Sequence, residues 1–337
     1  MNTPIDISSV VLKTNRLTLR PFRESDLDDF FEYASVDGVG QMAGWAPHTN
    51  KEDSKCILDR FINEKKVFAI DYEGKVIGSL GIENYNEEKF PEYADRQCRE
   101  IGFVLAKSYW GKGLMPEAVN RVIAYLFDEV GLDVIFCGHF LWNKQSARVQ
   151  QKCGFGFLSF GEFTTRMNTV EKERMNLLTK EEYERKKNGI RRIYFAGPLF
   201  NAAERDFNAK VVSVLEEAGY SVFLPQRDGI LAATLNKLTD EEKVKTVFAK
   251  DTSELARADV IVMLVDGRTP DEGACVELGL AFASGKPCYG LKTDARALEN
   301  GLSINPMIAG CFTDLLTADD TETLLQKLRV YLLNNAL

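Results

Sequence analysis

The segment DVIVMLVDGRTPDEGACVELGLAFASG, residues 259–285, decides the fold of the second half of the chain. It joins an apolar run of strand length to an apolar helical run through a glycine-containing loop. Continuous apolar strands that alternate with helices are typical of a parallel sheet covered on both faces. Ligands of such sheets bind beyond the carboxyl ends of the strands. Asp271, Glu272 and Glu277 follow such an end, so the segment predicts an acidic site there.

The flanking sequence continues this alternation. We expect strands at residues 193–196, 220–225, 260–265 and 288–291, and helices at residues 204–219, 241–257 and 274–284. The pattern predicts an α/β domain with a parallel sheet of the flavodoxin or Rossmann type.

A highly charged stretch, KEEYERKKNGIRR at residues 180–192, divides the chain. It contains one glycine and almost nothing to bury, and the β-rich run IYFAG follows it at residue 193. Two domains are also the natural expectation for 337 residues. We therefore expect one domain at residues 1–186 and a different one at residues 190–337.

Composition excludes several classes of function. The net charge is −8 and both halves are mildly acidic, which argues against nucleic acid or an anionic membrane as the main partner. No apolar run reaches the roughly 18 residues that span a bilayer, and the opening residues do not resemble a secretory signal. Seven scattered cysteines and two histidines favour reduced thiols in the cytoplasm over disulfides or a metal site.

The carboxylates of the opening segment suit glycosyl transfer. Glu277 is expected in the first turn of its helix, where the positive helix end favours the ionised form. An ionised carboxylate at a strand end is a suitable nucleophile for an anomeric carbon, and Asp271 could orient the sugar or transfer a proton. Retaining enzymes pair two carboxyl groups about 5 Å apart. The alternative is that Asp271 and Glu272 only cap the helix.

Asp251 is a third candidate, on the preceding helix. It lies on the same helical stripe as the apolar residues Val244, Val247, Phe248, Leu255 and Ala258. An ionisable group on such a stripe is unfavourable unless it faces a site. The alternative is that Asp251 pairs with Lys250 or Arg257 near the helix end.

Four motifs in this half occur in a fixed order. They are YFAGPLF at residues 194–200, LPQRDG at 224–229, DEGACVELG at 271–279 and NPM at 305–307. In these motifs and their spacing, the half from residue 191 to about residue 316 resembles the nucleoside 2-deoxyribosyltransferases. The resemblance implies exchange of nucleobases on deoxynucleosides without a cofactor.

The resemblance also implies roles for single residues. Glu277 corresponds to the nucleophile, and Asp251 and Asp271 to the aspartates that assist proton delivery and hydroxyl recognition. Tyr194 and Gly197 would line the sugar pocket. The base would face Gln226 and Asp228, while Asn305 would reach a neighbouring subunit's site, which implies a homo-oligomer.

A hydrolase remains an alternative for this half. Relatives that hydrolyse 2′-deoxynucleoside 5′-monophosphates share the fold and the glutamate, and tend to have serine at the position of Asn305. Asparagine suits an uncharged 5′-hydroxyl and favours nucleoside exchange, although Ser303 lies two residues away.

The first half contains a strand, a glycine-bearing turn and a helix in REIGFVLAKSYWGKGLMPEAVNRVIAYLF, residues 99–127. Residues 110–113 would present successive backbone N–H groups at a helix N-terminus, which is a natural cradle for a pyrophosphate. The alternative is an ordinary strand-to-helix turn.

Further motifs extend this pattern: RLTLRPF at residues 16–22, GKVIGSLGI at 74–82, and the N-x-x-S and K-x-GF elements that follow Asn143. Across about residues 10–180 the chain resembles the GNAT N-acetyltransferases, of the RimJ/RimL type. This implies a mixed, largely antiparallel sheet, acetyl-CoA as cofactor and an unidentified amine as acceptor.

Residue roles follow from this second resemblance. The cofactor would contact Val104 and Leu105 along its pantetheine arm, Gly111, Lys112 and Gly113 at its pyrophosphate, and Asn143 and Ser146 near its thioester. Glu100, at a strand end, would be the general base toward the amine, or alternatively only a surface partner. The chain departs from the family at Ser108, the first position of the phosphate motif, and at Gln150, where many members have a tyrosine acid. Water or Ser146 could then protonate the leaving thiolate.

Together the halves predict a bifunctional transferase whose small-molecule partners are nucleosides, nucleobases, acetyl-CoA and an amine. The alternative combines a deoxynucleotide N-glycosidase with a first half that only binds CoA or acts as a scaffold.

Overall fold

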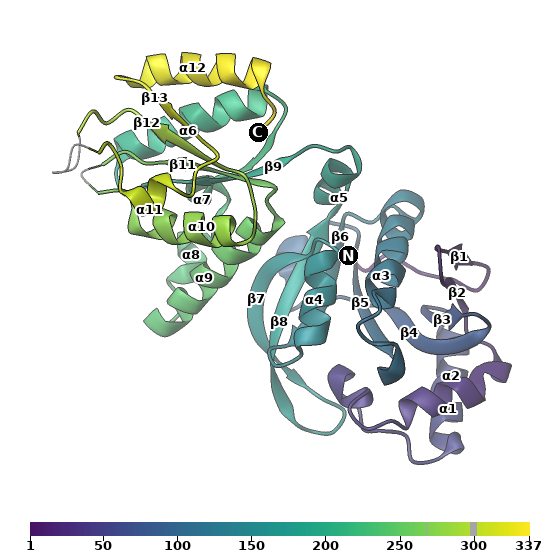
Figure 1. The fold of residues 1–337 in the computed structure, drawn as a ribbon. Coiled ribbons are helices and arrows are strands. Elements are labelled where there is room, and N and C mark those ends of the chain that lie inside the picture. The colour runs from purple at the N-terminus through teal and green to yellow at the C-terminus, as the bar shows by residue number, and fades with distance from the viewer. Residues whose placement is uncertain (268, 297–301) are drawn as a thin grey trace. The chain divides into compact units, whose positions relative to one another are not determined.

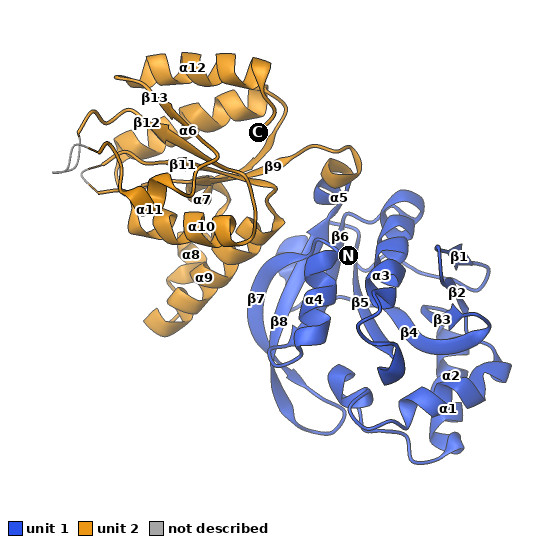
Figure 2. Cartoon of the chain, viewed as in Figure 1, with its two compact units in different colours: residues 1–183 blue, residues 184–337 orange. Residues whose placement is uncertain are grey.

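The computed structural model describes residues 1–267, 269–296 and 302–337. The chain forms two compact units, unit 1 at residues 1–183 and unit 2 at residues 184–337 (Figure 2). The charged stretch between them forms helix α5, Lys180–Lys187. The expectation that this stretch has almost nothing to bury is wrong for Tyr183. Its ring stacks on Phe127 at 5.1 Å, and its hydroxyl donates to Asp128 at 2.7 Å.

Unit 1, which is described in full, is built on an eight-stranded sheet in the order β1-β2-β3-β4-β5-β6-β8-β7 (Figure 1). Its strands are β1 Leu12–Lys13, β2 Thr18–Pro21, β3 Val67–Tyr72, β4 Lys75–Glu83, β5 Cys98–Leu105, β6 Val134–Phe140, β7 Gly156–Thr164 and β8 Val170–Thr179. Only β5 and β6 pair in parallel. The predicted mixed, largely antiparallel sheet is confirmed.

Helices cover both faces of this sheet, because alternate residues of a strand point to opposite sides. Phe68 and Ile70 face a core shared with α3, whereas Val67 and Ala69 face a core shared with α1 and α2. The longer helices are α1 Leu27–Ala34, α2 Lys51–Glu64, α3 Leu114–Tyr125 and α4 Lys144–Lys152. Short helical turns are η1 Glu24–Asp26, η2 Gly40–Ala43, η3 Pro91–Tyr93, η4 Lys107–Tyr109 and η5 Leu126–Val130.

The parallel strands β5 and β6 diverge part of the way along their length. Residues 98–100 of β5 pair with residues 134–136 of β6, and the two strands then continue to Leu105 and Phe140 without pairing to each other. The interior of the sheet therefore opens between them. The opening lies between residues 101–105 of β5 and residues 137–140 of β6.

Unit 2 is built on a parallel sheet that has five strands among the described residues, in the order β10-β9-β11-β12-β13. The strands are β9 Arg192–Ala196, β10 Ser221–Phe223, β11 Val260–Leu264, β12 Cys288–Lys292 and β13 Asp314–Thr317. This is the doubly wound order of flavodoxin-like folds, with a switch point between β9 and β11. The predicted parallel α/β class is confirmed, and β13 adds a strand beyond those expected.

Two cores cover the faces of this sheet. Ile193 and Val262 pack with α6 and α12, whereas Tyr194 and Ile261 pack with α9 and α10. The helices are α6 Ala202–Glu217, α7 Pro225–Asp228, α8 Ala232–Leu235, α9 Asp240–Arg257, α10 Glu272–Ala283, α11 Pro306–Ala309 and α12 Thr321–Asn334. Tyr194 therefore points toward the two helices that carry the candidate carboxylates. Every helix in the described ranges is too short or too polar to cross a bilayer.

Candidate active sites

The first site surrounds Glu277 at the carboxyl edge of the sheet in unit 2. The Tyr194 hydroxyl donates a hydrogen bond to Glu277 Oε1 at 2.6 Å. Helix α10 begins at Glu272, and Asp271 is its N-cap residue, with Oδ1 accepting from the Ala274 N–H at 2.7 Å. Glu277 therefore lies in the second turn, and its prediction in the first turn is wrong.

The environment of Glu277 favours its neutral form. Burial raises the pKa of its carboxyl to about 7. The hydrogen bond from Tyr194 acts in the opposite direction, and the charges of Asp251 and Asp271 raise the pKa further. The prediction that the helix end keeps Glu277 ionised is wrong, because a helix end acts mainly on its first turn and desolvation here is stronger. Near neutral pH the carboxyl is poised between its two forms.

Asp251 belongs to the same group of side chains. Its charge acts on both Glu277 and Tyr194. Burial raises the pKa of Asp251 to about 6 although Lys250 lowers it. Lys250 and Arg257, the partners of the alternative interpretation, each pair with Glu254 at 2.8 and 3.2 Å.

The stripe on which Asp251 was predicted to lie is not a buried one at its N-terminal end. Val244 is 71% exposed and Phe248 is 60% exposed, whereas Leu255 and Ala258 are buried. The helix passes from an exposed apolar face into the core, and Asp251 lies, partly buried, between the two. Position along the helix, and not the stripe alone, decides burial here.

Asp271 combines the two roles that the sequence left open. Its Oδ1 caps α10, as the simpler interpretation requires. Its charge also raises the pKa of Glu277, so it lies close enough to act on the same site. A cap fixes the side chain, which suits a group that must hold one orientation.

Close packing explains why Gly197, directly after β9, is a glycine. A Cβ on Gly197 would lie 3.2 Å from the Leu264 Cβ and 3.6 Å from the Asn208 Oδ1. The turn at residues 197–200 therefore passes closely over the end of β11.

Gln226 and Asp228, which were predicted to contact the base, form hydrogen bonds with other residues of the chain. The Gln226 carbonyl oxygen accepts from the Asn208 amide at 3.1 Å, and the Gln226 amide donates to the Arg205 carbonyl at 2.8 Å. Asp228 accepts from the Leu224 N–H at 2.9 Å and pairs with Arg227 at 2.8 Å.

Asn305 stands at the start of α11. It is exposed and caps α11, accepting from the Met307 N–H at 2.9 Å. The hydrogen bonds of the described residues do not connect it to Glu277.

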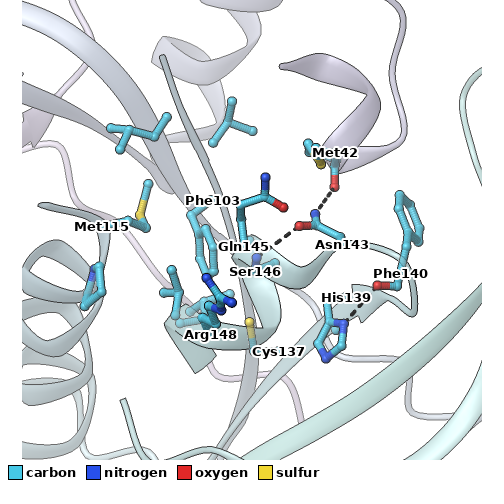
Figure 3. A pocket seen from close by; sticks show the side chains of 18 of the residues that line it. Met42, Phe103, Met115, Cys137, His139, Phe140, Asn143, Gln145, Ser146 and Arg148 are labelled. Carbon is cyan, nitrogen blue, oxygen red and sulfur yellow. Dashed lines mark hydrogen bonds between the residues drawn. The ribbon is translucent and has the colours of Figure 1, made fainter. Parts of the chain in front are cut away.

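The second site is a cavity of about 650 Å³ in unit 1 (Figure 3). It occupies the opening between β5 and β6. Of the residues predicted to bind the cofactor or to catalyse the reaction, those that line it are Glu100, Val104, Leu105, Gly111, Gly113, Asn143 and Ser146. Lys112 is not among the lining residues, and its ammonium lies 4.9 Å from the centre of the Tyr109 ring.

The glycine-bearing turn enters α3 in the conformation that a backbone cradle requires. Gly111 and Gly113 both have φ of +76°, which glycine adopts without strain. Gly113 is the N-cap of α3 and supplies no side-chain cap, so the N–H groups of the first turn remain for a ligand. The Trp110 indole N–H donates to the Leu105 carbonyl at 2.7 Å and ties the turn to β5.

Asn143 has a structural role in the cavity wall. Its Oδ1 caps α4 by accepting from the Ser146 N–H at 3.0 Å, and its amide donates to the Met42 carbonyl at 3.1 Å (Figure 3). The side chain thus joins α4 to the turn η2. Ser146, one turn into α4, is left facing the cavity.

Glu100 lies inside β5, and the prediction that it stands at a strand end is wrong. It is the last residue of β5 that pairs with β6, so it lies where the two strands separate. Burial raises the pKa of its carboxyl to about 7. The charge of Glu173 raises it further, and Lys89 lowers it.

Sequence reasoning missed Glu173 and His139, which line the same cavity. Glu173 is buried on β8 and pairs with Lys89 at 3.0 Å. A Cβ on Gly138 would lie 2.5 Å from Glu173 Oε1, so a glycine in β6 provides room for this carboxylate. The only sequence signal for Glu173 was Gly138 inside the strand VIFCGHF, residues 134–140.

Gln150, which replaces the family's tyrosine, is buried and fully hydrogen bonded. Its amide donates to the Gly138 carbonyl at 2.9 Å and to Ser146 Oγ at 3.2 Å. Its Oε1 accepts from the Asn176 amide at 2.6 Å. The bond to Ser146 occupies the hydroxyl oxygen and leaves the hydroxyl hydrogen to point elsewhere.

The fold and the sites define a two-domain enzyme, with an acidic strand-edge site in one domain and a cofactor-sized cleft in the other. Residues 16–156 match the sequence model of the acetyltransferase (GNAT) domain, and residues 193–309 match that of nucleoside 2-deoxyribosyltransferase. The chain is a fusion of a GNAT acetyltransferase domain with a domain of the nucleoside 2-deoxyribosyltransferase family. Both resemblances drawn from the sequence are confirmed.

Similar proteins include the uncharacterized N-acetyltransferase p20 of Bacillus licheniformis, 28% identical over 132 residues, which are 37% of this chain and 70% of that protein. The uncharacterized N-acetyltransferase YnaD of Bacillus subtilis is 28% identical over 146 residues, 42% of this chain and 81% of that protein. Among solved structures, a GNAT-family acetyltransferase from Bacillus anthracis is 23% identical and has a TM-score of 0.45, with coverage of 51% of this chain and 99% of that one.

Proposed function

We propose that unit 2 transfers a 2-deoxyribosyl group from one nucleobase to another through a covalent ester on Glu277. The observation that carries this proposal is the cluster at the sheet edge, where Tyr194 donates to Glu277 beside Asp251 and Asp271. A glycosyl ester needs one carboxylate as nucleophile and a second acidic group for the leaving group.

In the first step a Glu277 oxygen bonds to C1′ while the bond from C1′ to the base nitrogen breaks. The electron pair of that bond stays on the base, which takes a proton from Asp251. In the second step a nitrogen of the incoming base bonds to C1′, the ester bond breaks, and the proton returns to Asp251. An aspartate with a pKa of about 6 can both donate and accept near neutral pH.

Thymidine and adenine test the reaction. Incubation of the full chain with both should form deoxyadenosine and thymine, followed by chromatography. The hydrolase alternative is tested with thymidine 5′-monophosphate alone. Release of thymine and deoxyribose 5-phosphate without exchange would replace the transferase by the N-glycosidase.

Replacing Tyr194 with phenylalanine should raise the pKa of Glu277 above about 7, because the lost hydrogen bond favours the ionised carboxylate. Glu277 must be ionised to act as the nucleophile. The low-pH limb of the pH–rate profile for base exchange should therefore move up by roughly one pH unit. A pH–rate profile of base exchange measures the shift. Tyr289→Phe, in the other core of the unit, is the matched control, and equal profiles for the two variants would contradict the prediction.

We propose that unit 1 acetylates an amine. Acetyl-CoA supplies an activated acetyl thioester, and the residues present fit it. Gly111, Gly113 and the uncapped start of α3 suit its pyrophosphate, and the unpaired part of β5, at Val104 and Leu105, suits its pantetheine arm.

Glu100 then accepts a proton from the attacking amine, at the point where the sheet opens. The Ser146 hydroxyl, whose oxygen is held by Gln150, or a water molecule gives a proton to the leaving sulfur. Calorimetry with acetyl-CoA and thiol release over a panel of amines test this activity. Binding without turnover on any amine would favour the CoA-binding scaffold.

We propose that unit 2 acts as a homo-oligomer. Helices α9 and α10 lie against each other and carry exposed apolar side chains, and exposed Met307 follows on α11. The exposed large apolar residues of α9 and α10 are Val244, Val247, Phe248, Val276, Leu280 and Phe282. Monomers rarely expose large apolar patches, and Asn305, two residues before Met307, could reach a neighbour's site.

Replacing Leu280 with glutamate on this face should therefore reduce the assembly to monomers, because a buried unpaired charge opposes association. Light scattering after size exclusion measures the mass. Leu333→Glu on α12, which packs on the other face of the sheet, is the control and should leave the mass unchanged. A monomeric unsubstituted chain would exclude the proposal.

All seven cysteines are free thiols in the structure. This supports the proposal that the protein works in a reducing compartment, the cytoplasm.

A further inference from the structure

The side chains that line the cavity of unit 1 differ in charge between the helix and the strands. Arg148 and Lys152 line the cavity from α4. Glu83, Glu100 and Glu173 line it from β4, β5 and β8. Charges of one sign in a cleft attract ligand groups of the opposite sign. The strand side of the cavity therefore suits a positively charged group.

Glu173 is buried and is neutralised at only one of its two oxygens. Its side chain is 8% exposed, and Lys89 Nζ donates to Oε2 at 3.0 Å. Oε1 has no hydrogen-bond partner within unit 1, all of whose residues are described. A Cβ on Gly138 would lie 2.5 Å from Oε1, and Gly138 and Glu173 both line the cavity. A buried acceptor without a donor destabilises a fold, so this oxygen indicates that a ligand group binds it.

Glu100 lies close to this oxygen on the same face of the sheet. It pairs with Phe136 on β6, and Gly138 is two residues further along that strand, so all three positions share one face. Two residues of a strand span roughly 7 Å. The charge of Glu173 raises the pKa of Glu100, which agrees with a short separation of the two carboxyl groups.

The other ionisable groups around the two carboxyl groups leave this side of the cavity negative. Lys66 pairs with Glu83 at 2.6 Å and balances its charge. Burial lowers the pKa of His139 below its usual value, so this lining residue is neutral near pH 7. Arg174 is paired with His139 across the strands but does not line the cavity. Glu100 forms no ion pair with any residue of the fully described unit 1.

We infer that unit 1 acetylates a small amine that carries a second positive charge: the reacting amine lies at Glu100, and the second charge binds the free oxygen of Glu173. The inference rests on the proposed acetyl transfer and adds the class of its acceptor. The roughly 7 Å between the two positions suits a chain of about four carbons between the charges.

The second charge positions the acceptor and takes no part in the bond changes. The amine nitrogen bonds to the acetyl carbon while the bond from that carbon to sulfur breaks. The proton of the amine goes to Glu100, and the leaving sulfur takes the proton that Ser146 or water gives. Glu173 is thus a specificity residue for the acceptor, and Glu100 is the base.

Three acceptors of equal length test the inference on the unsubstituted chain. 1,4-Diaminobutane, pentylamine and 5-aminopentanoate share the reacting amine and its carbon chain, but they end in an ammonium, a methyl and a carboxylate group. The diamine should have a kcat/KM about tenfold or more above that of pentylamine, and 5-aminopentanoate should have the lowest value. Thiol release is measured at saturating acetyl-CoA and about pH 8.5, where Glu100 is ionised and the distal ammonium is still charged.

Glu173→Gln keeps the shape of the side chain and removes its charge. The ratio of kcat/KM for the diamine to kcat/KM for pentylamine should then fall to within about twofold of one. Glu162→Gln is the matched control. Glu162 is exposed on β7 and does not line the cavity, so its substitution should leave the ratio unchanged.

Equal acetylation of the diamine and pentylamine by the unsubstituted chain would overturn the inference. This comparison needs no variant, so it decides the matter even if Glu173→Gln does not fold. A preference for the diamine that persists in folded Glu173→Gln would also overturn it. Absence of thiol release with every amine, although acetyl-CoA binds, would instead refute the proposed acetyl transfer.

Discussion

Replacing Glu277 with alanine should abolish the exchange of thymine for adenine, lowering kcat by about 10³-fold or more. The side chain is the nucleophile of the proposed reaction, and no neighbour can take its place. Asp251 lies on another helix, and Asp271 is committed to capping α10. Deoxyadenosine formation from thymidine and adenine, measured by chromatography, gives the rate.

The control for this substitution is Glu272→Ala. Glu272 is exposed in the first turn of α10, where it contributes charge to the helix end but does not contact Tyr194. Its loss should leave the exchange rate within about twofold, in keeping with the small effect of an exposed charge at a helix end. Trapping the reaction with labelled deoxynucleoside should place the label on the peptide that contains Glu277. A label on another residue, or a product of inverted anomeric configuration, would exclude the ester mechanism.

Replacing Glu100 with glutamine should lower kcat/KM for the amine by about 10²- to 10⁴-fold, the usual contribution of a general base. The carboxyl accepts a proton only when it is ionised, and its pKa is raised to about 7 by burial and then by Glu173. Acetylation by the unsubstituted chain should therefore fall as the pH decreases through about 7. The glutamine variant should lack this limb.

The substitution Glu173→Gln distinguishes the role of Glu173 from that of Glu100, the other carboxyl group of the cleft. Because the charge of Glu173 raises the pKa of Glu100, its removal should move the acid limb to lower pH while acetylation persists. The profiles are measured by thiol release at saturating acetyl-CoA. If the Glu100→Gln variant still loses acetylation activity as the pH falls through about 7, the proton transfer belongs to another group.

The coarse features of both domains were readable from the residue pattern. Apolar strands such as residues 260–264 lie between two helical layers, so every side chain there is apolar and the parallel sheet can be inferred from sequence. Gly111 and Gly113 both adopt positive φ, and the turn before α3 was therefore also visible in the sequence. Local conformation and burial on both faces restrict which residue types can occur, so both can be inferred from the sequence.

Features that depend on pairing between distant segments were not readable. Glu100 was expected at a strand end, because where β5 and β6 separate depends on their register and not on either strand alone. Glu173 lies in a long strand of alternating pattern, and nothing in that strand marks it as a site residue. Its place in the cavity depends on Gly138 of the neighbouring strand, which provides room for its carboxylate. The exposed residues of α9 looked like a core stripe, because periodicity shows that a face is apolar but not what covers it.

By itself the sequence determined two α/β domains, the glycine turn and the acidic motif, because these follow from the local order of apolar, small and charged residues. The tertiary structure alone decided which groups share a site and in which protonation state. Burial between β9, α9 and α10 outweighs the helix end at Glu277, and the hydrogen bond from Tyr194, 83 residues away in sequence, opposes the effect of that burial. Desolvation and directional contacts arise only once distant segments have packed together.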